Sequence, residues 1–201
     1  MPKTWVLCVA ALAAAMVSAQ VPRGAQAPRS TPTPLGDQAP RGVWIDVPFV
    51  HQPRDGCGAA ALAMVMDYWA GQQSRRTPQP DVADVDRIQH ELYVPREHGI
   101  PASAMQGYLE RHGFRVFALS GRWSDLEEQL GKGRPLIVAI RPQGQKEFHY
   151  VVIVGVDPAR GLVTMNDPAE RKLLPEERAA FEKDWSATHN WMLLAVPAAA
   201  Q

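Results

Sequence analysis

Residues 52–69 read QPRDGCGAAALAMVMDYW, so a polar turn leads directly into an apolar run. Drawn as a helix, the run from Cys57 onward is apolar around most of its circumference, which predicts a buried helix rather than one on the surface. Gly56 and Gly58 flank the cysteine and allow the backbone to approach a ligand closely. We therefore expect a buried helix over residues 57–69 with a thiol in its first turn.

The position of this thiol favours nucleophilic chemistry. A cysteine in the first turn of a helix lies near unpaired backbone N–H groups and the positive end of the helix dipole. Both stabilise the thiolate, which is the form that attacks a carbonyl carbon. Alternatively, the two glycines only permit a tight turn and Cys57 is a small buried hydrophobic residue. The residues of this segment leave both interpretations open.

Further helices are expected downstream of this one. The spacing of apolar residues predicts helices over residues 81–92, 101–112, 124–130 and 175–184. Asp81 is the expected N-cap of the first, and Ser124 and Glu127 form an expected capping box in the third.

Strand patterns dominate the second half of the chain. They predict strands over residues 114–119, 136–141, 149–156, 162–166 and 191–196. The turn sequence DPARG at residues 157–161 joins two of these strands as a hairpin. Helices first and strands later is the order of an α+β fold. We expect an antiparallel sheet beside the buried helix that carries Cys57.

Three polar residues are candidate partners for the thiol, because a thiolate peptidase also needs a proton donor and a stabilised oxyanion. His149 opens a strand and Asp167 follows the strand paired with it, so Asp167 is expected to orient the imidazole. Gln52, together with the backbone N–H of Cys57, is the expected oxyanion donor. Asp157 competes with Asp167 for the orienting role, although its place beside Pro158 favours a turn.

These residues resemble those of the papain-like cysteine peptidases that process bacteriocin leaders, cysteine peptidase family thirty-nine. The resemblance covers VPFVHQ at 47–52, DGCGAAALAMV at 55–65, GRPLIV at 133–138, HYVVIVGVD at 149–157, NDPA at 166–169 and NWMLL at 190–194. It implies a papain-like fold in which Cys57 is the nucleophile, His149 the general base and acid, Asp167 the orienting residue and Gln52 part of the oxyanion hole. It also implies that neither a metal nor an organic cofactor is needed.

The amino-terminal segment predicts export. Residues 1–19 contain Lys3, then an apolar run over residues 5–17 and small residues at the end, the layout of a signal peptide cleaved after Ala19. The run is too short to span a bilayer, which takes about 20 residues, and a buried helix or anchor is the alternative. Cleavage would remove Cys8, leaving Cys57 without a partner for an intramolecular disulfide.

The composition of the rest of the chain predicts a linker, a folded domain and a short tail. Residues 20–41 contain five prolines and no aromatic residue, which is typical of a disordered linker. Residues 42–197 form the expected peptidase domain and residues 198–201 a tail.

Charge and histidine spacing limit the partners. The chain has 21 Lys and Arg against 21 Asp and Glu, so it lacks the basic surplus of a nucleic-acid binder. The other histidines lack metal-ligand spacing, and His51 is expected to lie in a loop. The segment 93–99 is expected either to contact substrate or to connect two elements. We expect a monomer, periplasmic or secreted, that acts on a peptide or protein.

The expected activity is hydrolysis of a peptide bond through an acyl-enzyme. Many members of the family are fused to a membrane-spanning, ATP-driven exporter, whereas this chain is expected to carry its own export signal, so its substrate is not expected to be a leader awaiting export. Two alternatives stay open. One is an acyl or peptidyl transferase, as in the phytochelatin-synthase-like enzymes, and the other is a non-catalytic module that binds peptides.

Overall fold

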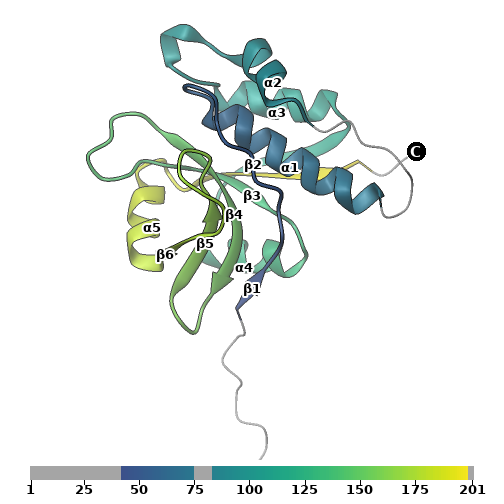
Figure 1. Cartoon of the computed structure of the whole chain (residues 1–201). Coiled ribbons are helices and arrows are strands. Elements are labelled where there is room, and N and C mark those ends of the chain that lie inside the picture. Colours follow the sequence, from purple (N-terminus) through teal and green to yellow (C-terminus); the bar gives the residue numbers. More distant parts are fainter. Residues whose placement is uncertain (1–41, 75–82, 199–201) are drawn as a thin grey trace, which may run out of the picture. The chain divides into compact units, whose positions relative to one another are not determined.

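An antiparallel sheet is the centre of the computed structural model, which describes residues 42–74 and 83–198 (Figure 1). In these residues the sheet has seven strands, six of them in the order β2-β7-β3-β4-β5-β6, while β1 pairs with β4. The strands are β1 (Val43–Trp44), β2 (Phe114–Ser120), β3 (Leu136–Ile140), β4 (His149–Asp157), β5 (Leu162–Asn166), β6 (Leu174–Glu177) and β7 (Trp191–Pro197). The predicted signal peptide and linker lie outside the described residues and stay predictions.

Helices cover both faces of the sheet. They are α1 (Cys57–Ser74), α2 (Val85–Leu92), the short 3-10 helix η1 (Pro95–Glu97), α3 (Ala102–Arg111), α4 (Trp123–Gly131) and α5 (Arg178–Ser186). In Figure 1, α1 crosses one face with α2 and α3 beside it, and the core residues of α4 and α5 belong to a separate cluster on the other face. None of the helices within the described ranges is long and apolar enough to cross a bilayer.

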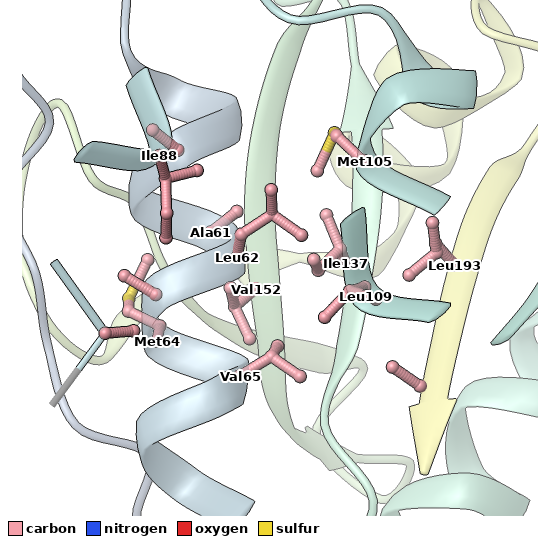
Figure 2. Packing of buried hydrophobic residues seen from close by; sticks show 14 of the residues in the cluster. Ala61, Leu62, Met64, Val65, Ile88, Met105, Leu109, Ile137, Val152 and Leu193 are labelled. Carbon is pink, nitrogen blue, oxygen red and sulfur yellow. The ribbon is translucent and has the colours of Figure 1, made fainter. Parts of the chain in front are cut away.

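The two faces of β4 bury different residues, as the period of two along a strand requires. Val152 and Val154 belong to the cluster that contains α1, whereas Val151 and Ile153 belong to the cluster of α4 and α5. Figure 2 shows Val152 beside Leu62 of α1. Every side chain of α1 from residue 59 to 65 is at most 1% exposed, which confirms the predicted buried helix.

The start of α2 differs from the prediction. The helix begins at Val85, and its N-cap is Asp84 rather than Asp81, which lies outside the described residues. The Asp84 carboxylate accepts the backbone N–H groups of Asp86 and Arg87 at 3.0 and 3.1 Å. These bonds satisfy two N–H groups that the first helical turn leaves free, so the helix starts there.

The predicted capping box of α4 is also wrong. The helix begins at Trp123, and the Asp125 carboxylate accepts the backbone N–H of Arg122 at 2.8 Å. Asp125 therefore does what Glu127 was expected to do, and Ser124 lies inside the helix rather than at its cap.

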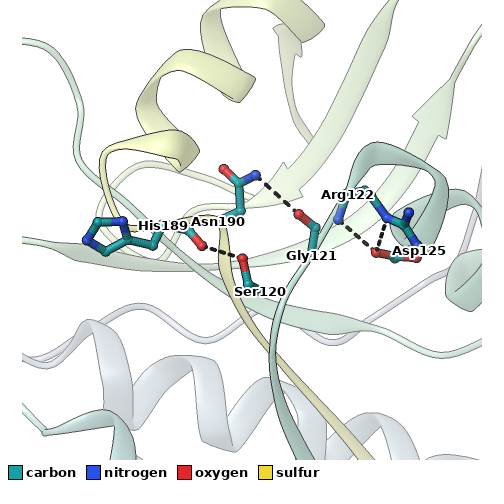
Figure 3. A network of polar contacts seen from close by, with 6 residues as sticks. All are labelled: Ser120, Gly121, Arg122, Asp125, His189 and Asn190. Carbon is teal, nitrogen blue, oxygen red and sulfur yellow. Dashed lines mark hydrogen bonds and ion pairs between the residues drawn. The ribbon is translucent and has the colours of Figure 1, made fainter.

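The segment just before α4, at Ser120 and Gly121, is held by hydrogen bonds to a turn at His189 and Asn190 (Figure 3). His189 and Asn190 both have left-handed backbone conformations, with φ of 58° and 55°. Ser120 Oγ donates to the carbonyl of His189 at 2.8 Å, and Asn190 Nδ2 donates to the carbonyl of Gly121 at 3.2 Å. This contact holds the end of β2 beside the start of β7, which sets where α4 can begin.

The predicted helix over residues 175–184 is the largest error in the secondary structure. Residues 174–177 form β6, which pairs with β5 from Leu162 and Glu177 to Met165 and Leu174, and α5 follows only at Arg178. Pairing with a neighbouring strand thus overrides the local helical pattern. The other predicted strands agree within two residues, and β5 has the predicted bounds.

Candidate active site

Cys57 is the first residue of α1, and a tight turn delivers it there. The Gly56 N–H donates to the carbonyl of Pro53 at 2.9 Å, and the Gly56 carbonyl accepts the N–H of Ala60 at 3.0 Å. A Cβ on Gly56 would lie 2.5 Å from Cγ of Pro53, so only glycine fits this turn. The half-buried thiol therefore lies at the positive end of an 18-residue helix.

His149 and Asp167 meet because the β4–β5 hairpin aligns them. His149 is the first residue of β4, and Asp167 directly follows β5, whose last residue Asn166 pairs with Val152. His149 Nε2 donates to Asp167 Oδ1 at 2.8 Å, and the two side chains are only 19% and 10% exposed. The hairpin thus brings together the two residues that the sequence analysis paired.

The environment of His149 favours its charged form. Burial by itself lowers the pKa of His149, but the hydrogen bonds to Asp167 and Cys57 and the charges of both groups raise it to about 9. Because Nε2 is bonded to Asp167, Nδ1 is the nitrogen left for Cys57. The imidazole is therefore bonded to the carboxylate on one side, and the thiol lines the same cleft.

His149 and, to a lesser extent, a backbone turn hold Asp167 in its ionised form. Burial raises the pKa of Asp167, but the hydrogen bond from His149, the charge of that ring and the Ala169 N–H outweigh burial and lower it. The Ala169 N–H donates to Asp167 Oδ1 at 2.8 Å, and the Asp167 N–H donates to the carbonyl of Arg171 at 3.1 Å. An ionised carboxylate accepts hydrogen bonds only, which fixes the proton on Nε2 of the ring.

Gln52 is tied to the same turn. Its backbone N–H donates to the carbonyl of Pro168 at 3.0 Å, so the segment before Cys57 and the segment after β5 are bonded to each other. The Gln52 Oε1 atom is buried and accepts no hydrogen bond from the described residues. Gln52 lines the same cleft as Cys57, which is the location that its expected role as oxyanion donor requires.

Asn166 is a site residue that the sequence analysis did not assign. Its side chain is 0% exposed, donates to the carbonyl of Val47 at 3.2 Å and accepts the N–H of Leu173 at 3.0 Å. It therefore fixes the end of β5, immediately before Asp167, to the segment that leads from β1 to Gln52. The sequence signalled it by a polar residue at the end of an apolar strand and by its place in NDPA, but its contact with Val47, 119 residues away, had no local signal.

An open cleft of about 530 Å³ contains all four predicted site residues. Its size is in the usual range for ligand sites in proteins. The lining residues are Gln52, Asp55, Cys57, His98, Pro142, Gln145, Glu147, Phe148, His149, Asp167, Ala169 and Glu170. The loop between β3 and β4 thus forms one wall, and the segments around Cys57 and Asp167 form others.

Other residues weighed in the sequence analysis are now placed. Asp157 accepts the N–H of Arg160 at 3.0 Å and so shapes the turn between β4 and β5, as expected. His51 is exposed and contacts Phe49 edge to face at 4.7 Å. His98, with a left-handed φ of 48°, lines the cleft, so the segment 93–99 contributes to the site.

A metal site needs a group of side chains that together bind the ion. Within residues 42–74 and 83–198, no group of three or more His, Cys, Asp or Glu side chains is arranged to hold a metal ion. That the protein needs neither metal nor cofactor stays a prediction.

Two solved structures share the fold. A chain assigned as a C39-like peptidase from Bacillus anthracis is 18% identical, with a TM-score of 0.59 over 78% of this chain and 98% of that chain. The peptidase domain of Streptococcus ComA, a bifunctional ABC transporter involved in quorum sensing, is 18% identical, with a TM-score of 0.57 over 76% of this chain and 99% of that domain. These similarities confirm the predicted papain-like α+β fold, with the cysteine helix packed on the antiparallel sheet.

The family assignment comes from the sequence. No curated protein matches this chain. The sequence model of the Peptidase_C39 like family, however, matches residues 44–192, a range that contains Gln52, Cys57, His149 and Asp167. Since this match covers well over half of the chain, the protein belongs to the Peptidase_C39 like family.

Proposed function

We propose that this protein is an exported thiol peptidase that hydrolyses a peptide bond through an acyl-enzyme on Cys57. The observation that carries the proposal is the His149–Asp167 hydrogen bond in an open cleft that Cys57 also lines. Membership in a family of peptidases supports the reaction class. The pattern of residues 1–19 supports export.

Acylation starts with transfer of the Cys57 proton to Nδ1 of His149. The sulfur then attacks the carbonyl carbon of the substrate, a C–S bond forms, and the carbonyl electron pair moves to oxygen. The Gln52 amide and the Cys57 backbone N–H donate hydrogen bonds to this oxyanion. When the oxyanion collapses, the C–N bond breaks and His149 gives its proton to the departing nitrogen.

Deacylation uses the same residues in reverse. A water molecule gives a proton to His149 as its oxygen attacks the acyl carbon. The C–S bond breaks, the carboxylic acid leaves, and the sulfur departs as the thiolate beside the charged imidazole. The pKa of His149, raised to about 9, favours this charged ring, and ionised Asp167 keeps it aligned.

The first test is the rate at which iodoacetamide alkylates Cys57 as a function of pH, in the wild-type chain and in His149→Ala. Mass spectrometry of the peptide that contains Cys57 is needed, because Cys8 also reacts if it is retained. An ordinary thiol is only about a few parts in ten thousand ionised at pH 5. We expect fast alkylation at pH 5 in the wild type and a rate at least about 100-fold lower in the variant. Slow alkylation that rises only above pH 8, alike in both chains, would contradict the proposal.

The second test identifies the product. A mixture of peptides is incubated with the wild type, with Cys57→Ala and with Cys8→Ala as the matched control. We expect new carboxyl termini with the wild type and Cys8→Ala, and none with Cys57→Ala. If an added amine is incorporated in place of water as the main product, the protein is a transferase, and if no peptide is changed while Cys57 is intact, it is a binding module.

A further inference from the structure

The charged side chains along the cleft are almost all of one sign. Besides Asp167, which is paired with His149, the cleft is lined by the carboxylates Asp55, Glu147 and Glu170, and among the described residues no lysine or arginine lines it. The whole chain, by contrast, has equal numbers of acidic and basic residues. The negative charge is therefore a local property of this cleft.

None of these three carboxylates is neutralised by an ion pair within residues 42–74 and 83–198, because the ion pairs there involve other residues. Asp55 accepts a hydrogen bond from the uncharged Tyr93 hydroxyl at 3.4 Å. Lys146 and Arg171, next to Glu147 and Glu170 in the chain, are exposed and do not line the cleft. The carboxylates thus keep charge available to a ligand.

The backbone keeps each carboxylate near the site. Asp55 belongs to the turn that delivers Cys57, and its left-handed φ of 53° fixes the direction of that turn. Glu147 precedes His149 by two residues. The Glu170 N–H donates to the backbone carbonyl of Asp167 at 3.1 Å. A peptide bound with its carbonyl between Cys57 and His149 would run along these side chains.

Phe148 is a second, independent feature of the same wall. It lines the cleft and is 56% exposed, so its ring offers apolar surface to a ligand in the cleft. The guanidinium carbon of Arg141 lies 5.8 Å from its ring centroid, so this ring already contacts a cation. An aromatic ring beside Glu147 suits the aliphatic stem of a lysine or arginine, whose charged end can reach a carboxylate.

We propose that the cleft selects peptides with a lysine or arginine side chain next to the bond that is cleaved, and that Glu147, Glu170 and Phe148 determine this specificity. The proposal rests on the proposed peptidase function and defines its substrate class. Neutral and acidic peptides are poorer substrates, since they leave the carboxylates desolvated without a counter-charge.

The test uses three peptidyl acyloxymethyl ketones that differ only in one side chain, which is lysine, norleucine or glutamate. Attack by the Cys57 sulfur forms a C–S bond and releases a carboxylate, and mass spectrometry measures the rate. One series carries the side chain next to the ketone, and another carries it one residue earlier. Each rate is divided by the iodoacetamide rate of the same protein, so that changes in thiol reactivity cancel.

In at least one series we expect the lysine probe to react roughly tenfold faster than the norleucine probe, and the glutamate probe to react slowest. The lysine advantage should shrink at high ionic strength. Glu147→Gln and Glu170→Gln should each reduce the ratio of lysine to norleucine rates several-fold. The matched control is Glu177→Gln, which removes an exposed carboxylate outside the cleft and should leave the ratio unchanged.

The outcomes separate the two proposals. Equal rates for the lysine and norleucine probes, with labelling that depends on His149, would overturn the specificity and leave the peptidase function standing. A ratio that falls as much in Glu177→Gln as in the cleft variants would also overturn it, because the effect would then be one of overall charge. Absence of His149-dependent labelling by every peptidyl probe would overturn both.

Discussion

His149 is bonded through Nε2 to Asp167, which leaves Nδ1 as the ring nitrogen for Cys57. Replacing the carboxylate by an amide tests this arrangement with little change in shape. In Asp167→Asn we expect the pKa of His149 to fall from about 9 toward the ordinary value, because the negative charge that raises it is gone. Peptidase turnover should fall by about 100-fold or more, as the ring loses the partner that fixes its proton on Nε2.

NMR titration of the His149 ring protons measures this pKa directly. The matched control is Asp157→Asn, which removes a carboxylate from the same hairpin but leaves the His149–Asp167 bond intact. A pKa that falls equally in both variants would mean that overall charge, and not the direct contact, raises it.

At the scale of elements, the first turn of α1 decides where the thiol lies. Gly56→Ala would bring a Cβ to 2.5 Å from Cγ of Pro53 and 2.9 Å from its carbonyl oxygen, so the turn has to open. We expect a loss of about 1 to 3 kcal/mol in the free energy of unfolding and slower alkylation of Cys57 at pH 5. Urea unfolding and the iodoacetamide rate measure the two effects.

Gly71→Ala is the matched control in the same helix. A Cβ at Gly71 meets no atom within 4 Å, so the substitution should raise the free energy of unfolding by about 0.5 to 1 kcal/mol and leave the alkylation rate unchanged. Equal effects of the two substitutions would show that the turn does not position the thiol.

At the scale of the whole molecule, the His149–Asp167 pair couples stability to pH. Asp167 raises the pKa of His149 above the ordinary 6.5, so the pair stabilises fully below about pH 6.5, and this contribution is lost as pH rises through the folded pKa. We compare His149 with His149→Gln, both in a Cys57→Ala background so that titration of this thiol does not contribute. The stability advantage of His149 should fall by roughly 1 to 2 kcal/mol between pH 6 and pH 9.5.

Chemical unfolding at a series of pH values checks this expectation. Burial and the nearby charges of Cys57 and Glu97 raise the pKa of Tyr150 to about 12. Burial, the largest of these causes, and Glu97 are kept in the Cys57→Ala background, so Tyr150 titrates above this range. A stability difference that stays constant or grows with pH would contradict the prediction.

What the sequence determined by itself was local. The apolar run after Cys57 required a buried helix, and the DPARG turn required the hairpin that aligns His149 with Asp167. These features follow from residues close together in the chain, whose backbone preferences and apolar spacing act without the rest of the molecule. For that reason these elements were predictable, whereas the site residues were proposed from their places at element ends and from the family resemblance.

Only the tertiary structure decided the features that depend on contacts between distant parts of the chain. β6 replaces a predicted helix because β5 lies beside it, and Asn166 joins the site because its amide reaches Val47, which is 119 residues away. The carboxylates of the cleft likewise come from segments that are separate in the sequence. Such contacts form only when α1 packs on the sheet, since local preferences hold no information about which distant groups then become neighbours.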